Sequence, residues 1–176
     1  VEYLLPHKPD LVISGINRGS NLGTDILYSG TVSAAMEAAI LGIPAMAVSL
    51  TEYKEPNYHF AANFVVSLIK TVRGYNLFHN TMLNINVPGK ALEDIAGVSI
   101  TRLGIRQYRN AFQERVDPRG KRYYWLAGEV VDILDSVAED TDVWAINNSF
   151  ISITPVHFDL TDYTILKKMK SIEWKI

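Results

Sequence analysis

Cysteine is absent from this chain of 176 residues. Its absence excludes disulfide bonds, thiolate metal sites and a cysteine nucleophile, and it fits a reducing, cytoplasmic compartment. No apolar stretch approaches the ~20 residues of a spanning helix, so we expect no membrane association. The formal net charge is only −2. With no strong overall field of either sign, we expect no nucleic-acid partner.

Strand and helix patterns alternate in the first half of the chain. Residues 10–15 form a short apolar run ending in glycine, which is typical of a strand buried on both faces. Ser29 is an N-cap residue before a helical pattern, and apolar strands follow at 45–50 and 81–87, separated by a second amphipathic helix. This order predicts an α/β fold with a parallel sheet, whose loops gather at the carboxyl ends of the strands.

The second half has a different pattern. It predicts a strand at 98–101, a long hairpin over 105–130 around Asp117-Pro118-Arg119-Gly120, a late strand at 150–156 and a C-terminal amphipathic helix. We expect a single domain over 1–176. In it, 1–100 form the α/β core, and 101–176 form the hairpin, the late strand and a C-terminal oligomerisation arm.

Arginine and aromatic side chains are interleaved along the predicted hairpin. Both residue types are enriched at protein interfaces, so we favour an oligomer contact. A surface that attracts anionic substrate at a pocket entrance and a nucleic-acid surface remain as alternatives. The acidic stretch 132–142 offers a complementary surface, although such stretches are usually only solvated.

The loop over 14–31 has the composition of a ligand site. Asn17 and Asn21 place amide oxygens, which suit Mg²⁺ or Mn²⁺, in a glycine-rich segment. Ser29-Gly30-Thr31 lie where the next helix begins, and free backbone N–H groups there attract anions. The common alternatives are that Ser29 only caps the helix and that Asn17 only bonds a turn. The glycine spacing matches neither a dinucleotide-binding fingerprint nor a P-loop.

Two segments of this loop, SGINRGSNLG at 14–23 and YSGTV at 28–32, closely resemble the SurE family of stationary-phase survival proteins. LNINVP at 83–88, TRLG at 101–104 and SITP at 152–155 extend the resemblance along the chain. The resemblance implies a Rossmann-like sheet with helices on both faces. It also implies an acid-phosphatase-like hydrolase that acts as a 5′/3′-nucleotidase on nucleoside monophosphates, and for some members on short polyphosphate. One divalent metal ion, Mg²⁺ or Mn²⁺, is the implied cofactor, and a homodimer or homotetramer the implied assembly.

The resemblance also assigns site residues. It makes Asn17 a metal ligand, and it places in the phosphate and substrate site Ser29, Gly30, Thr31, Asn21 and Asp25. One departure affects the chemistry, because the family's Asn-Asp-Asp-Gly motif, which holds the metal, is absent from this sequence. The catalytic residues therefore stay unassigned, and we expect this chain alone to be inactive. The alternative is a non-catalytic module that binds nucleotide or phosphate, or that forms oligomers.

Overall fold

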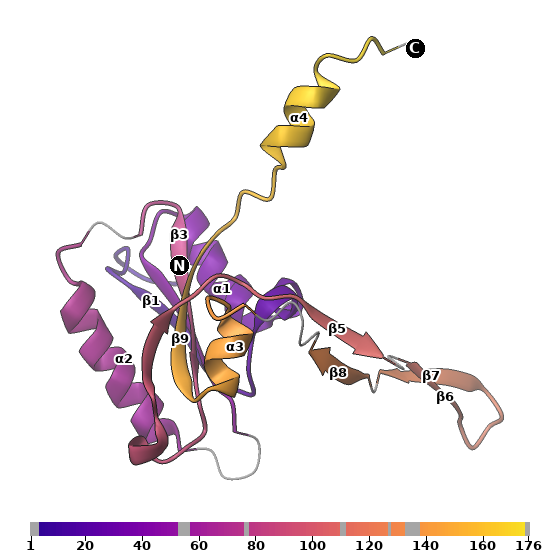
Figure 1. Cartoon of the computed structure of the whole chain (residues 1–176), viewed down its shortest axis with the longest axis horizontal. Helices are drawn as coiled ribbons and strands as arrows, with labels where there is room; N and C mark the ends of the chain where they lie inside the picture. The colour runs from indigo at the N-terminus through magenta and orange to yellow at the C-terminus, as the bar shows by residue number, and fades with distance from the viewer. Residues whose placement is uncertain are drawn as a thin grey trace.

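A five-stranded sheet forms the centre of this computed structural model, which describes residues 4–52, 57–75, 78–109, 112–126, 128–132 and 138–174 (Figure 1). The strand order is β1-β2-β3-β9-β4, with β1 at Val12–Arg18, β2 at Ala45–Leu50, β3 at Thr81–Val87, β9 at Phe150–His157 and β4 at Gly97–Ile100. Strands β1, β2 and β3 are parallel, whereas β9 runs antiparallel to β3 and parallel to β4. The α/β fold with a mostly parallel sheet is confirmed. Strands β9 and β4, which form one side of the sheet, run opposite to the other three.

Helices cover both faces of the sheet, as predicted. Side chains alternate between the two faces along β2. Ala45 and Ala47 belong to the core under α1 (Gly30–Ile40), while Met46 and Val48 belong to the core under α2 (Tyr58–Val72). Every residue of β2 is buried, as expected of a strand between two helical layers.

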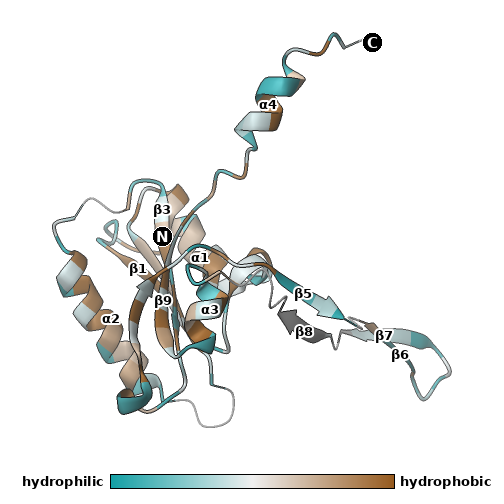
Figure 2. Cartoon of the chain, viewed as in Figure 1, coloured by the Kyte–Doolittle hydropathy of each residue, from teal (hydrophilic) through white to brown (hydrophobic). Residues whose placement is uncertain are grey.

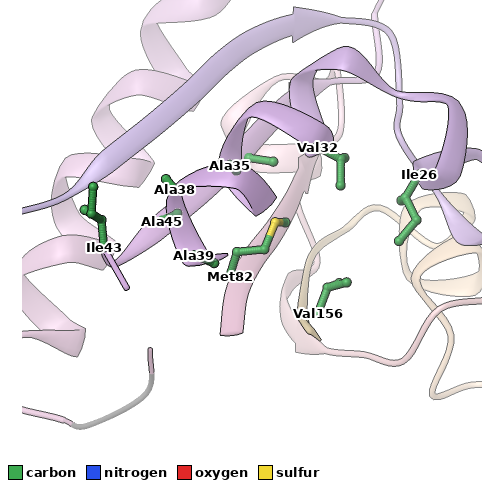
Figure 3. Packing of buried hydrophobic residues seen from close by; sticks show 10 residues of the cluster. Ile26, Val32, Ala35, Ala38, Ala39, Ile43, Ala45, Met82 and Val156 are labelled. Carbon is green, nitrogen blue, oxygen red and sulfur yellow. The ribbon is translucent and has the colours of Figure 1, made fainter. Parts of the chain in front are cut away.

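Small side chains bring α1 close to the sheet. Figure 3 shows Ala35, Ala38 and Ala39 of the helix in one cluster with Met82 and Val156 of the strands beneath. Figure 2 shows hydrophobic residues concentrated in the sheet and its helices, and mostly polar or neutral ones along β5, β6 and β7. The core therefore lies on both sides of β2 and β3.

The predicted hairpin extends away from this core (Figure 1). Strand β5 (Arg106–Arg109) pairs with β8 (Glu129–Asp132), and β6 (Phe112–Val116) pairs with β7 (Arg122–Leu126), both antiparallel. At its tip one Asp117 carboxylate oxygen accepts from the backbone N–H groups of Arg119, at 2.9 Å, and Lys121, at 2.8 Å. An aspartate that bonds to the backbone two residues on is a recurrent turn device, and it explains the predicted turn.

The C-terminal arm also leaves the core. It carries α4 (Tyr163–Met169), which lies apart from the sheet in Figure 1. Its apolar residues Ile165, Leu166 and Met169 are 45%, 37% and 44% exposed, so a large part of this apolar face is left uncovered by the described part of the chain. The remaining short helices are η1 (Gly23–Tyr28), η2 (Leu92–Asp94) and α3 (Asp142–Asn147). No helix among the described residues is both long and apolar enough to cross a membrane.

Strand β1 differs from the prediction of a fully buried strand over 10–15. It runs to Arg18 and lies at the edge of the sheet, where Ile13 is 44% exposed. No other strand among the described residues pairs with its outer side. The register with β2 shifts between Ser14 and Asn17, so Asn17 lies in the last, irregular part of the strand and not in the loop after it.

Candidate functional site

The predicted site residues come from one continuous stretch, which runs from the end of β1 through the loop at 19–22 and the short helix η1 to the start of α1. These segments connect β1 to its parallel neighbour β2. The loop after β1 and the start of α1 therefore lie at the carboxyl edge of the parallel strands, where α/β sheets bind ligands.

Asn17 is half-buried near the carboxyl end of β1. Its side-chain nitrogen donates a hydrogen bond to the backbone oxygen of Gly19 at 3.0 Å. This bond serves the local turn, as the simpler interpretation of Asn17 predicted. It also fixes the orientation of the amide, so that the side-chain oxygen is the group left to bind a ligand.

The described residues do not by themselves form a site for a divalent cation. No group of three histidine, cysteine or carboxylate side chains is placed to hold a metal ion anywhere in the described ranges. Hard cations such as Mg²⁺ and Mn²⁺ favour carboxylate ligands, and one neutral amide oxygen holds them weakly. Asn17 fits such an ion only as one ligand among others.

Ser29 caps α1, as its position before the helical pattern predicted. Its hydroxyl oxygen accepts from the backbone N–H of Val32 at 3.2 Å, and the residue is buried. The first N–H groups of a helix have no acceptor within the helix. Because the hydroxyl takes the N–H of Val32, those of Gly30 and Thr31 remain for a ligand, at the positive end of the helix dipole.

Gly30 borders open space. A β-carbon added there would meet no atom within 4 Å, so packing does not require a glycine. Glycine at the start of a helix also costs stability relative to alanine. A ligand that approaches the backbone closely at this point would account for the absence of a side chain.

Asn21 fastens the loop onto the sheet. Its backbone N–H donates to the Asn86 side-chain oxygen at 2.9 Å, and its side-chain nitrogen donates to the Ser49 hydroxyl at 2.7 Å. The side-chain nitrogens of Asn84 and Asn86 both donate to its carbonyl oxygen at 2.9 Å. Asn21 is only 8% exposed. The structure thus gives this residue a positioning role, and its contact with substrate stays a prediction.

Asn84 and Asn86 were not among the predicted site residues. They are fully buried in β3, and both hold the carbonyl of Asn21. Two asparagines at alternate positions of an otherwise apolar strand were the available signal, since buried amides need partners.

Asp25 joins η1 to the base of the hairpin. Its carboxylate accepts from the Arg106 guanidinium at 2.9 Å and from the Tyr108 hydroxyl at 2.5 Å. Thr24 adds two bonds, because its hydroxyl donates to the Arg106 carbonyl and accepts from the Arg106 N–H. A carboxylate repels phosphate, whereas this one is neutralised by Arg106, so Asp25 is better suited to contact an uncharged part of a ligand.

Asp142 is a third residue that was not predicted from the sequence, because it was grouped with the solvated acidic stretch. That interpretation is wrong for Asp142, which is fully buried and accepts from the N–H groups of Gly23, Gly104 and Val143 at 2.7, 2.8 and 2.9 Å. Burial raises the pKa of Asp142, while these N–H bonds and the charge of Arg106 act in the opposite direction. Residues 133–137 of the same stretch lie outside the described residues.

Two hollows flank η1. One, of about 610 Å³, is lined mainly by apolar groups of η1, α1, residues 101–104 and residues 154–160, which lead into the C-terminal arm. The other, of about 500 Å³, lies between η1 and β5. Both have the size of ordinary ligand pockets.

Known proteins resemble this chain over nearly its whole length. The family model described as survival protein SurE matches residues 1–110. A 5'-nucleotidase SurE from Pelotomaculum thermopropionicum is 55% identical over 98% of this chain and 64% of its own length. Another, from Thermosynechococcus vestitus, is 56% identical over 90% of this chain and 60% of its own length.

A solved structure gives the same result. The crystal structure of a SurE protein from Aquifex aeolicus superposes with a TM-score of 0.79 and 44% identity, covering 93% of this chain and 65% of that one. The chain thus spans somewhat less than two thirds of the length of several relatives that it matches. The match covers the loop after β1, the start of α1 and strand β3 with its two asparagines, and this chain belongs to the SurE family.

Proposed function

We propose that this chain takes part in the hydrolysis of nucleoside monophosphates, as a 5′- and 3′-nucleotidase, with short polyphosphate as a further substrate. The observation that carries the proposal is the open start of α1, where Gly30 leaves backbone N–H groups accessible. The relatives named 5'-nucleotidase support it.

In this proposal the start of α1 binds the phosphate. The N–H groups of Gly30 and Thr31 would stabilise the negative charge that develops on the phosphoryl oxygens during hydrolysis. The bonds that hold Asn21 and Ser29 fix the loop and the helix start in position before substrate arrives. Such a preorganised set of donors contributes most when it need not rearrange during the reaction.

We also propose a divalent metal ion, Mg²⁺ or Mn²⁺, as the cofactor, with Asn17 as one ligand. The carboxylate ligands that such an ion favours are not grouped among the described residues. The same observation keeps open a second function, a module that binds nucleotide or phosphate without turnover.

We further propose a homodimer or homotetramer that works in the cytoplasm. The apolar residues of α4 are exposed, and the hollow of about 610 Å³ lies at the root of the arm that carries this helix. The hairpin adds exposed aromatic residues, and the Arg115 guanidinium lies 5.3 Å from the centre of the Trp125 ring. Exchange of arms between two copies would cover the apolar face of each helix.

The test is hydrolysis of AMP by the full-length protein with Mg²⁺ or Mn²⁺. The Asn17→Ala variant should lose at least about tenfold in kcat/KM at limiting metal, or about 1.4 kcal/mol of transition-state stabilisation. Asn63→Ala, which changes an exposed asparagine on α2, is the matched control and should retain full activity. Binding of AMP without hydrolysis would favour the non-catalytic function, and neither binding nor hydrolysis would refute both.

A further inference from the structure

The hollow of about 500 Å³ between η1 and β5 does not include the backbone at the start of α1 that is proposed to bind phosphate. Its wall includes Leu27 and Tyr28 from η1 and Arg106 and Tyr108 from β5. Its volume is sufficient for a ligand of moderate size, and it combines aromatic surface with a few polar groups, as small-molecule sites do.

The aromatic surface of this hollow is available for contact. Tyr28 is 90% exposed, so almost none of its ring is used in packing, and Tyr108 is partly covered but still 46% exposed. The hydroxyl of Tyr108 donates to Asp25, and this bond holds its ring in place at the hollow. Exposed, oriented tyrosine rings provide stacking platforms for the flat faces of nucleobases.

The charged side chains at the hollow neutralise each other, which suits an uncharged ring. Arg106 and Asp25 form an ion pair at 2.9 Å in which both side chains are largely buried, so their charges offset each other. A nucleobase is neutral near pH 7, and its edge carries hydrogen-bond donors and acceptors. A free anion such as inorganic phosphate gains less from this hollow than from the start of α1.

The hollow is adjacent to the proposed phosphate site. Tyr28 and Gly30 are two residues apart, so their Cα atoms are separated by at most about 7 Å. In a nucleoside monophosphate the base and the phosphate are joined through one sugar ring. A single nucleotide can therefore contact both places at once.

We propose that this hollow is the nucleoside subsite of this SurE-family chain, with the base stacked on Tyr28 and Tyr108. The inference rests on the proposed nucleotidase function and adds the residues that distinguish a nucleotide from a simple phosphate ester. Purine monophosphates, with the larger ring, gain more from the stacking than pyrimidine monophosphates.

The experiment compares AMP with glycerol 2-phosphate, which has no ring, as substrates of the full-length protein. Tyr28→Ala should raise KM for AMP about tenfold, within the range expected for loss of one base stack. It should leave kcat/KM for glycerol 2-phosphate unchanged, so the ratio of the two kcat/KM values falls about tenfold. Tyr28→Phe keeps the ring and should restore the ratio. Tyr75→Ala, which removes another exposed tyrosine, should not alter it.

The subsite and the nucleotidase function fail on different outcomes of this experiment. An unchanged ratio in Tyr28→Ala, or an equal loss with both substrates, would overturn the subsite while the nucleotidase function stands. If the parent hydrolyses neither substrate, the nucleotidase function fails. The subsite is then decided by calorimetric titration with AMP, where Tyr28→Ala should weaken binding about tenfold and equal affinity would overturn it.

Discussion

Gly30 offers the sharpest test of the phosphate site, because its replacement by alanine should lower activity without lowering stability. A β-carbon at this position meets nothing within 4 Å, so Gly30→Ala introduces no clash. Alanine is favoured over glycine in helices by up to about 1 kcal/mol, partly because it restricts the unfolded chain. We therefore expect the free energy of unfolding to stay unchanged or to rise by up to about 1 kcal/mol.

Gly30→Ala should bind phosphate more weakly. A phosphate oxygen accepts from a backbone N–H at an N···O distance of about 2.7–3.2 Å. A methyl group on Gly30 would occupy the open space beside that N–H and keep the oxygen at van der Waals distance, about 3.5 Å or more. Loss of one hydrogen bond to a charged group costs about 1.5–3 kcal/mol. This corresponds to a fall in kcat/KM of roughly 10- to 150-fold.

The assay pairs urea unfolding with hydrolysis of AMP by the full-length protein. Gly42→Ala, at the other end of α1, is the matched control. Gly42 has a positive φ of 67°, so alanine there should cost about 1 kcal/mol of stability and leave kcat/KM unchanged. If Gly30→Ala retained full activity, phosphate would not bind at the start of α1. If it unfolded more readily, the glycine would be structural.

Three further predictions concern the scaffold and the assembly. In Gly15→Ala the β-carbon would lie 2.3 Å from the Val48 carbonyl oxygen at a φ of 119°, and urea unfolding should show a loss of about 3 kcal/mol. Asp142→Ala leaves three buried N–H groups without their acceptor and should also cost about 3 kcal/mol, whereas exposed Asp140→Ala should change stability by less than about 0.5 kcal/mol. Removing residues from Thr161 onward should weaken the assembly in sedimentation velocity, and an unchanged mass at micromolar concentration would argue against arm exchange.

The core elements could be predicted because their signals are local. Short, largely apolar runs predicted β2 and β3 with the same bounds that the structure shows. The end of β1 was misplaced, since Asn17 and Arg18 are polar and read as loop although they are paired in the strand. The direction of β9 could not be predicted, because an apolar run has no polarity and its partner β3 is far away in the sequence.

The site residues also differ in whether their signals are local in the sequence. The start of α1 was found because Ser29 and the N–H group that it caps are three residues apart. Asp142 and Asn86 were missed because they bond to Gly23 and Asn21 across 119 and 65 residues. Sequence reasoning identified the groups that face a ligand, and only the fold showed which groups hold them.

The bonds around residues 19–31 have a consequence for the thermodynamics of binding. Asn86 and Ser49 hold Asn21, Asp142 holds Gly23, and Arg106 holds Asp25, so this loop is fixed before any ligand arrives. A flexible loop loses conformational entropy when it closes on a ligand, and that loss weakens binding. Here little of that entropy remains to be lost. Association with a nucleotide should therefore proceed without a slow closing step, at a rate set mainly by diffusion and orientation.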